Sequence, residues 1–134
     1  MLVADWQHVT HRLLAALDDE LSDLGLSAAE VNALAAFAGA TSRTVRELVD
    51  ATGQRPSTFT GVLDRLERRG LSERRPNPAD RRSILVALTP SGLVAAARVA
   101  SAFAGLERRI DERLPAGEMR RALAALVAVL DEDA

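Results

Sequence analysis

The chain has 134 residues and no cysteine, so it suits one domain with a moderate core and excludes disulfides, thiolate metal sites and cysteine-based redox sensing. Its longest apolar run, Ala122 to Leu130, has nine residues, fewer than the ~20 of a membrane helix, and no signal-peptide pattern opens the chain, so we expect a cytoplasmic protein without membrane contact. The net charge is −2, but the charges are unevenly distributed: residues 42–82 hold ten Arg and six acidic residues, and the rest of the chain holds seven Arg and thirteen acidic residues. A basic segment in an otherwise acidic chain is typical of a nucleic-acid-binding surface.

Two helices are predicted before residue 39. The first covers residues 3–24, where apolar side chains recur at 4-3-4 spacing and then along a neighbouring stripe: Leu2, Trp6, Val9, Leu13, Leu14, Leu17, Leu21 and Leu24. An apolar face this wide indicates burial against more than one partner. Gly25 ends this helix, and Ser27 with Glu30 forms a capping box for a second helix, which we expect to run to about Ala38 and to bury Phe37.

A helix, a short turn and another helix are predicted between residues 44 and 70. Thr44 and Glu47 form a capping box for the first of these helices, and Gly53 interrupts the chain after it. The second helix begins near Pro56 and has apolar residues at i, i+3, i+4 and i+7, so one face must be buried: Phe59, Val62, Leu63 and Leu66. Its opposite face is small, hydroxylated and charged. This is the helix-turn-helix pattern, whose second helix enters the DNA major groove.

Two short strands are predicted next, at residues 71–75 and 83–88, because Ile84, Val86 and Leu88 alternate onto one face. The link between the strands, residues 76–82, is stiffened by prolines and is basic at its end. A strand pair with a charged tip after a helix-turn-helix predicts a winged helix.

Two more helices are predicted after the wing. Thr89 and Pro90 are typical of a helix start, and this Ala-rich helix should run to about Arg113 before Pro115 breaks it. A last helix from about Ala116 carries apolar residues at 4-3-4 spacing: Met119, Leu123, Leu126 and Leu130. A winged helix is complete near residue 89, so the apolar faces of the terminal helices need another partner. We expect that partner to be a second copy of the chain, in a homodimer; an intramolecular helical subdomain is the alternative.

Residues 26–92 resemble the MarR family of bacterial transcriptional regulators. The resemblance depends on the order and spacing of four segments: residues 26–30, 57–60, 66–71, and 77–82 running on to 88–92. It implies a mainly α fold with a small β-wing, in which a winged helix-turn-helix lobe at 27–89 lies between dimerisation helices at 1–25 and 90–134, all within one domain. It also implies a sequence-specific DNA-binding regulator, most simply a ligand-responsive repressor that binds a pseudo-palindromic operator as a homodimer. Gly61 departs from the family, which often has a basic or long residue there.

The candidate contacts to double-stranded DNA lie on the second helix of the helix-turn-helix and on the wing: Arg55, Ser57, Thr58, Thr60, Gly61, Asp64, Arg65, Arg75, Asp80, Arg81 and Arg82. Hydroxyls can bond phosphate or base edges, and Arg65 can pair with guanine O6 and N7. The alternative for Ser57 is a role at the helix N-terminus. The resemblance assigns residues 80–82 to the loop whose Arg enters the minor groove, where we expect Asp80 to orient an Arg; a solvated turn is the alternative.

Four residues are candidates for an effector site, because the family holds small phenolic or anionic ligands between its dimer helices and its DNA-binding lobe: Trp6, His8, His11 and Phe37. Trp6 could equally belong to a dimer core. His8 and His11 have no evident third ligand, so we expect no metal site, and nothing indicates a cofactor or an enzyme. A winged-helix protein-interaction module that does not bind DNA remains the alternative function.

Overall fold

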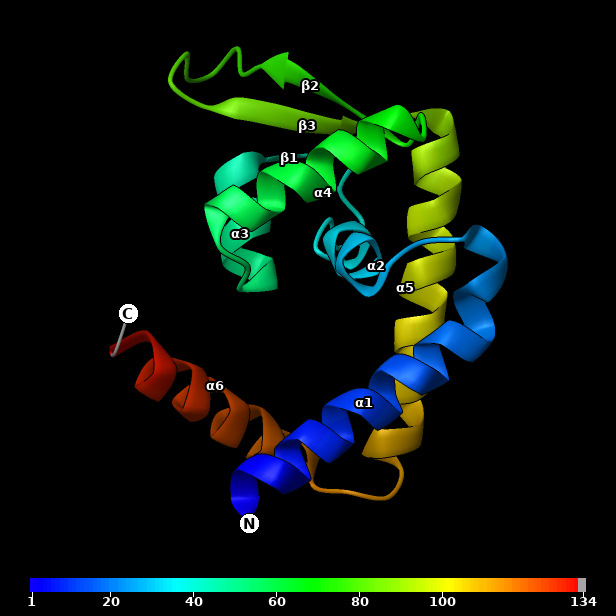
Figure 1. The fold of residues 1–134 in the computed structure, drawn as a ribbon, viewed down its shortest axis with the longest axis vertical. Coiled ribbons are helices and arrows are strands. Elements are labelled where there is room, and N and C mark those ends of the chain that lie inside the picture. Colours follow the sequence, from blue (N-terminus) through cyan, green and yellow to red (C-terminus); the bar gives the residue numbers. More distant parts are fainter. Residues whose placement is uncertain (133–134) are drawn as a thin grey trace. The chain divides into compact units, whose positions relative to one another are not determined.

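The structure is a computed structural model that describes residues 1–132, and Figure 1 shows its elements. In chain order they are α1 (Leu2–Leu21), the 3₁₀ helix η1 (Ser22–Leu24), α2 (Ala28–Ala35), β1 (Ser42–Thr44), α3 (Val45–Thr52), α4 (Pro56–Arg68), β2 (Ser72–Pro76), β3 (Ile84–Leu88), α5 (Pro90–Asp111) and α6 (Ala116–Glu132). The chain forms two compact units, Met1–Phe103 and the part that follows from Ala104. The predicted class, mainly α with a small β-wing, is confirmed.

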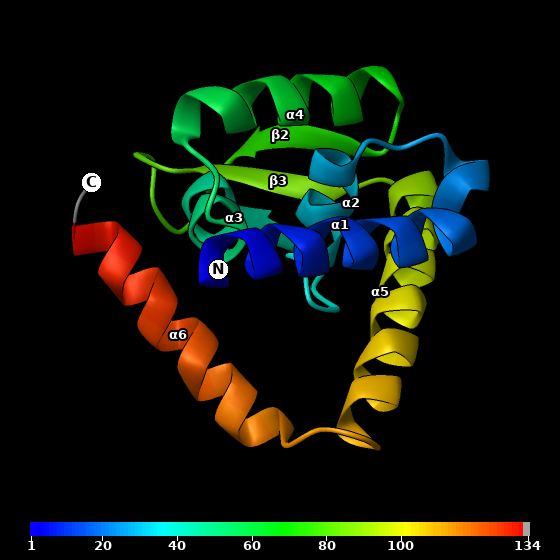
Figure 2. The same cartoon turned by 60° about the horizontal axis from the view of Figure 1, so that its bottom comes forward.

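The sheet has three antiparallel strands in the order β1-β3-β2. The hairpin of β2 and β3 is the predicted wing, and Arg74 of β2 pairs in register with Val86 of β3. Helix α4 packs beside β2, as Figure 2 shows. The strand β1 is a feature that sequence patterning missed, because its three residues have no apolar alternation and Thr44 also caps α3.

The core of the first unit forms where α2, α3, α4, β3 and α5 meet. The apolar face predicted for α4 is confirmed, since all four of its residues are at most 2% exposed: Phe59, Val62, Leu63 and Leu66. Phe37, Leu48 and Val99 pack into the same cluster. Burial of these side chains is the main stabilising term for the lobe, at roughly 1.5–3 kcal/mol for each large apolar residue.

The predicted end of the second helix, at Ala38, is three residues too late. The helix tightens after Ala35: the N–H groups of Phe37 and Ala38 donate to carbonyls three residues back, at 3.3 and 3.1 Å. Ala38 and Gly39 then take left-handed backbone angles, with φ of 48° and 84°. The Phe37 carbonyl accepts two hydrogen bonds, from the Ala40 N–H at 2.9 Å and from Arg43 Nε at 2.8 Å, which fix the turn after this helix.

The wing is joined to α5 by a very close contact at residues 70–71. Thr89 Oγ1 donates to the Gly70 carbonyl at 2.6 Å and accepts from the Gly92 N–H at 3.0 Å, while the Thr89 N–H donates to the Leu71 carbonyl at 3.0 Å. A Cβ atom on Gly92 would lie 1.8 Å from the Leu71 oxygen. Only glycine therefore fits where α5 starts, and the predicted cap at Thr89 is confirmed.

The terminal helices expose apolar side chains in the single chain. Leu2, Val9 and Leu13 of α1 are 72%, 54% and 41% exposed. The described part of α6 has no buried residue, and Met119, Leu123 and Leu130 of its predicted seam are 38%, 43% and 62% exposed. Among residues 1–132, no helix is long and apolar enough to cross a membrane.

Candidate nucleic-acid interface

The N-terminal turn of α4 is open to solvent. Arg55 is the N-cap and makes no side-chain cap bond, and Pro56 occupies the first helical position. The first intrahelical bond runs from the Phe59 N–H to the Arg55 carbonyl, so the N–H groups of Ser57 and Thr58 have no helical partner. Ser57 therefore does not cap the helix. The free N–H groups and the hydroxyls of Ser57 and Thr58 suit an anion such as DNA phosphate.

Thr60 and Gly61 follow on the same helix. Thr60 is exposed, and its hydroxyl donates back to the Pro56 carbonyl at 3.1 Å, so its oxygen stays available as an acceptor. Gly61 leaves the helix backbone partly exposed one turn ahead of Arg65. The Arg65 Nε donates to the Glu30 carboxylate at 3.1 Å, and the Arg65 side chain is 44% exposed.

Asp64 and Glu67 hold the wing against α4 through Arg74. The Nε and the backbone N–H of Arg74 both donate to one Glu67 oxygen at 2.9 Å, and Arg74 also pairs with Asp64. The hydrogen bond from Arg74 is the main reason that the pKa of Glu67 lies below its ordinary value. The same contacts raise the pKa of Arg74. Asp64, one of the predicted DNA contacts, thus connects the helix to the wing through Arg74.

The wing loop is a polar turn built around Asn77 and Asp80. Asn77 Nδ2 donates to Ser83 Oγ at 2.8 Å, and its Oδ1 accepts from the Ala79 N–H at 3.0 Å. The Asp80 carboxylate accepts from the backbone N–H of Arg82 at 3.0 Å, so Asp80 orients the main chain at Arg82 and leaves the guanidinium free. Arg81 and Arg82 are exposed and form no ion pair with any residue in the range 1–132.

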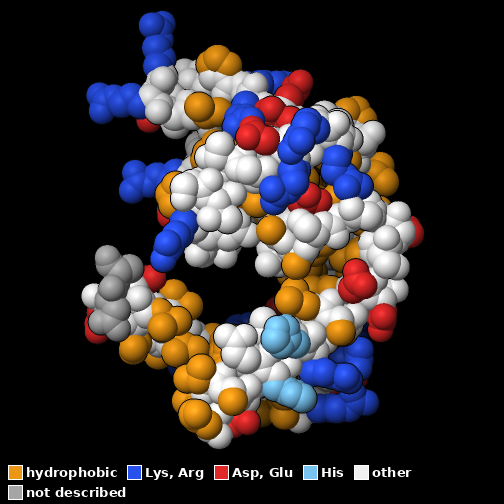
Figure 3. All heavy atoms as spheres, viewed as in Figure 1, with side chains coloured by type: hydrophobic (Ala, Val, Ile, Leu, Met, Phe, Trp, Pro, Cys, Tyr) orange, Lys and Arg blue, Asp and Glu red, His pale blue; other side chains and the backbone are white. Residues whose placement is uncertain are grey.

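The ten arginines of residues 42–82 divide into two groups. Five are held by contacts inside the lobe: Arg43, Arg65, Arg69, Arg74 and Arg75. The other five are exposed and have no ion-pair partner within the described chain: Arg46, Arg55, Arg68, Arg81 and Arg82. Of these, Arg68 makes one long hydrogen bond, from its Nε to the Asp64 carbonyl at 3.4 Å. Basic side chains project from the wing loop and the adjoining side of the helix-turn-helix (Figure 3). The second group therefore carries the charges available to DNA phosphate, while Arg65 of the first group is held through its Nε alone.

Arg46 and Arg68 were not among the predicted DNA contacts. Arg46 lies in the first turn of α3, and it lines one hollow with Asn77, Asp80 and Arg82 of the wing loop. Helical spacing could have indicated it, because the neighbouring Leu48 is fully buried and Arg46 falls on the opposite face. The hollow brings the start of α3 and the wing together on one basic surface.

Acidification is expected to weaken the contact between α4 and the wing. Because the pKa of Glu67 is lowered on folding, its stabilising effect is complete above the ordinary glutamate pKa of about 4.3 and is lost as pH falls through the folded-state pKa. Between about pH 6 and pH 3, the melting temperature of the wild type should therefore fall more than that of Glu67→Gln. Glu73→Gln, which removes an exposed acid that pairs with Arg75, is the control. Equal pH dependence in all three proteins would contradict a stabilising role for Glu67.

The four candidate effector residues do not line one hollow within the first unit. Trp6, His8 and His11 lie on the exposed half of α1, whereas Phe37 is 1% exposed and lines a hollow beside α5. The described residues contain no cluster of three side chains able to hold a metal ion.

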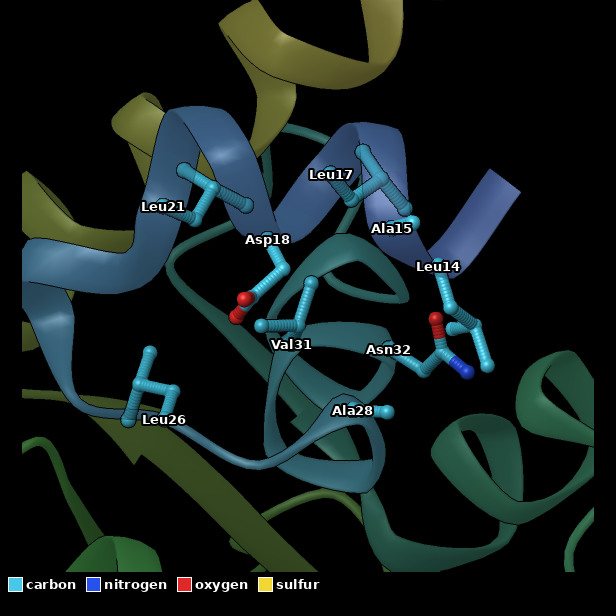
Figure 4. Close-up of a pocket in the computed structure, with 9 residues that line it drawn as sticks. All are labelled: Leu14, Ala15, Leu17, Asp18, Leu21, Leu26, Ala28, Val31 and Asn32. Carbon is cyan, nitrogen blue, oxygen red and sulfur yellow. The ribbon is translucent and has the colours of Figure 1, made fainter. Parts of the chain in front are cut away.

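A separate hollow of about 290 Å³ lies between α1 and α2. Its walls are mainly apolar and carry two polar groups, as Figure 4 shows: Leu14, Ala15, Leu17, Asp18, Leu21, Leu26, Ala28, Val31 and Asn32. Asp18 directs its carboxylate toward α2, and Asn32 lies beside Leu14 (Figure 4). No basic side chain lines this hollow, so a carboxylate ligand would meet repulsion there from Asp18.

Comparison with known proteins places this geometry in a family. A sequence profile described as the MarR family matches residues 24–83. The transcriptional repressor NicR of Pseudomonas putida is 36% identical over 91 residues, which are 65% of this chain and 55% of NicR. The multiple antibiotic resistance protein MarR of Escherichia coli is 38% identical over 76 residues, 57% of this chain and 53% of that protein. The chain thus spans about half the length of the curated relatives it matches.

Similarity to solved structures extends over almost the whole chain. Reduced Escherichia coli MarR is 30% identical with a TM-score of 0.69, covering 97% of this chain and 96% of that one. A mutant MarR in complex with operator DNA has a TM-score of 0.73 at 29% identity, with coverage of 96% and 93%. BpsR of Bordetella bronchiseptica has a TM-score of 0.70 at 26% identity, with coverage of 97% of this chain and 98% of that one. Its structure concerns the regulation of DNA binding by 6-hydroxynicotinic acid. The chain belongs to the MarR family of transcriptional regulators.

Proposed function

We propose that this protein is a sequence-specific, DNA-binding transcriptional repressor that acts in the cytoplasm as a homodimer and is released from its operator by a small ligand. Its role is regulation and not catalysis. The observation that carries the proposal is the group of exposed arginines without an ion-pair partner in residues 1–132, on the wing loop and the helix-turn-helix: Arg46, Arg55, Arg68, Arg81 and Arg82. The operator complex of MarR, a protein of the same family, supports it.

The docking that follows from this surface has two parts. The open N-terminus of α4 meets the major groove, where Arg55 and the free N–H groups of Ser57 and Thr58 can bond phosphate. The wing meets the neighbouring minor groove, where the guanidinium groups of Arg81 and Arg82 favour narrow A·T-rich sequence. Phosphate contacts set the register of the protein, and contacts to base edges provide specificity.

The exposed apolar faces of the terminal helices support the homodimer. Leu2 and Val9 of α1, and Leu123 and Leu130 of α6, are each more than 40% exposed in the single chain. Exposed apolar surface of this extent marks an interface in a protein that functions in water. A two-fold dimer presents two α4 helices, so the operator is a pseudo-palindrome with half-sites about 10 bp apart.

Selection of DNA fragments with the purified protein tests this function. The wild type should bind a pseudo-palindrome, and its affinity should fall steeply with salt because Arg–phosphate contacts release counterions. Arg82→Ala should weaken binding roughly tenfold for every sequence and reduce the salt slope by about 1 for each lost contact. Fluorescence anisotropy at several salt concentrations measures both quantities. Arg113→Ala, which removes an exposed Arg outside the helix-turn-helix and wing, is the charge-matched control.

The alternative, a winged-helix module for protein interaction, predicts the opposite result. Such a protein would enrich no DNA sequence, and Arg82→Ala and Arg113→Ala would behave alike. Salt-independent binding, or a footprint over a single half-site, would also contradict the proposed docking.

A small phenolic or anionic ligand is proposed as the releasing signal, as 6-hydroxynicotinic acid regulates BpsR. Within the first unit, the hollow between α1 and α2 suits a neutral phenol, because Asp18 and Asn32 can accept or donate hydrogen bonds and leucines cover the ring. Trp6, the one tryptophan of the chain, is the reporter. Phenol and benzoate at millimolar concentration should be compared for their effect on Trp6 fluorescence and operator affinity. If neither compound changes either quantity, the ligand proposal is wrong.

A further inference from the structure

A glutamate in the core of the DNA-binding lobe is connected to the helix that faces DNA. Glu30 is only 4% exposed, although an ionised carboxylate is costly to bury unless it is paired. One oxygen, Oε2, accepts the Ser27 N–H at 3.0 Å and completes the capping box of α2. The other oxygen, Oε1, accepts the Nε of Arg65, a residue 35 positions later on α4, at 3.1 Å.

The second capping box of the chain shows that capping does not require burial. Glu47 caps α3 through the Thr44 N–H at 3.1 Å, in the same way that Glu30 caps α2, yet the Glu47 side chain is 52% exposed. The Glu30 side chain is 5% exposed. Both glutamates also pair with an arginine, Glu47 with Arg43 at 3.3 Å, but only Glu30 is shielded from water, so its charge depends on the pairing with Arg65.

Arg65 is held by only one edge of its guanidinium group. Glu30 engages Nε, and the two terminal amino groups form no other hydrogen bond within residues 1–132. The Arg65 side chain is 44% exposed, so it can be reached from solvent. A guanidinium with its two terminal amino groups free has the fork geometry that pairs with guanine O6 and N7.

Gly61 places no side chain beside the guanidinium of Arg65. It lies one helical turn before Arg65, and a Cβ atom at this position would be 3.5 Å from the Nη1 of Arg65. That distance is an ordinary van der Waals contact, so a larger side chain at position 61 would begin directly beside the guanidinium.

We infer that Glu30 is a positioning residue that presents the terminal amino groups of Arg65, across the surface left open by Gly61, to one guanine in each half-site. The inference rests on the proposed DNA-binding function. It adds that α4 reads a guanine and that the buried Glu30 orients the arginine that reads it. Orientation by Glu30 reduces the conformational entropy that Arg65 loses when it binds the base. If Arg65 served only to neutralise Glu30, changing either residue would alter stability and weaken binding to all sequences alike.

The test compares guanine with 7-deazaguanine, which lacks the N7 acceptor, at each guanine of the selected operator. For the wild type, substitution at one position in each half-site should weaken binding roughly tenfold. Glu30→Gln should lose most of this sensitivity, while its affinity for unrelated DNA and its salt slope stay unchanged. Glu47→Gln, which alters the other capping box and does not contact α4, should retain the full sensitivity.

Two further variants test the same inference even if Glu30→Gln does not fold. Arg65→Lys retains the charge that pairs with Glu30 but lacks the fork, so it should lose sensitivity at the same base pair. Gly61→Leu should lose it as well, because its side chain competes with the guanidinium for space. The inference is overturned if the variants that fold keep the wild-type response to 7-deazaguanine, or if they weaken binding to all sequences equally. A wild type that enriches no DNA would instead overturn the proposed function, and this inference with it.

Discussion

Replacing Gly92 by alanine is expected to destabilise the lobe by about 3 kcal/mol or more, the upper range for inserting atoms into a packed interior. The added methyl group would overlap the Leu71 carbonyl oxygen, 1.8 Å from the ideal Cβ position. That oxygen cannot move freely, because it accepts the Thr89 N–H at 3.0 Å. Relief of the overlap would require a shift of α5 or of the chain entering β2, and urea unfolding followed by circular dichroism measures the loss of stability.

Ser91→Ala is the control for this substitution. Ser91 is exposed in the same first turn of α5, so its replacement should change the free energy of unfolding by less than about 0.5 kcal/mol. If Gly92→Ala were as stable as Ser91→Ala, the close contact between α5 and Leu71 would not exist in solution.

Leu123→Asp is expected to raise the dimer dissociation constant by roughly a hundredfold or more, since a carboxylate without a partner would enter an apolar interface. Leu123 is 43% exposed in the single chain and belongs to the seam that includes Met119 and Leu130. Within one chain the substitution costs little, so its effect isolates the interface. Sedimentation velocity over a range of protein concentrations measures the constant.

Arg121→Asp provides the comparison, because it places the same residue at an exposed polar position of α6. It should leave the dimer largely intact. A Leu123→Asp protein that is dimeric at the wild-type concentration would show that this seam is not the interface. Deletion from Ala116 onward should agree with the substitution and yield aggregate or unfolded chain.

The parts of the fold that were predicted depend on signals within a few residues of one another. The capping boxes at Ser27 and Thr44, the apolar face of α4 and the helix start at Thr89 are each encoded by residues at most seven positions apart, and all are present. Helical spacing determines which side chains share a face, whatever the rest of the chain does. The basic segment at residues 42–82 was also evident from composition.

The parts that were missed depend on residues distant in sequence. Which atoms of an arginine are free for DNA is decided by its partner: Arg69 uses both terminal amino groups on the Gly25 and Leu24 carbonyls, whereas Arg65 bonds Glu30 through its Nε alone. Neither pairing has a local pattern. The strand β1 exists because β3 offers it an edge, and its three residues would not indicate a strand alone. Sequence therefore indicated the basic surface but not which of its charges are available.

The junction of Leu71, Thr89 and Gly92 has a mechanical consequence. Hydrogen bonds and the tight contact between Gly92 and the Leu71 carbonyl join the first turn of α5 to the base of both strands of the wing hairpin. We therefore expect these segments to move as one rigid lever that pivots near the Leu71 carbonyl. A tilt of α5 by a small angle is then magnified at the wing tip, which lies at the far end of the two strands (Figure 2). A ligand that tilts the first turns of α5 is therefore expected to move Arg81 and Arg82 without contacting them.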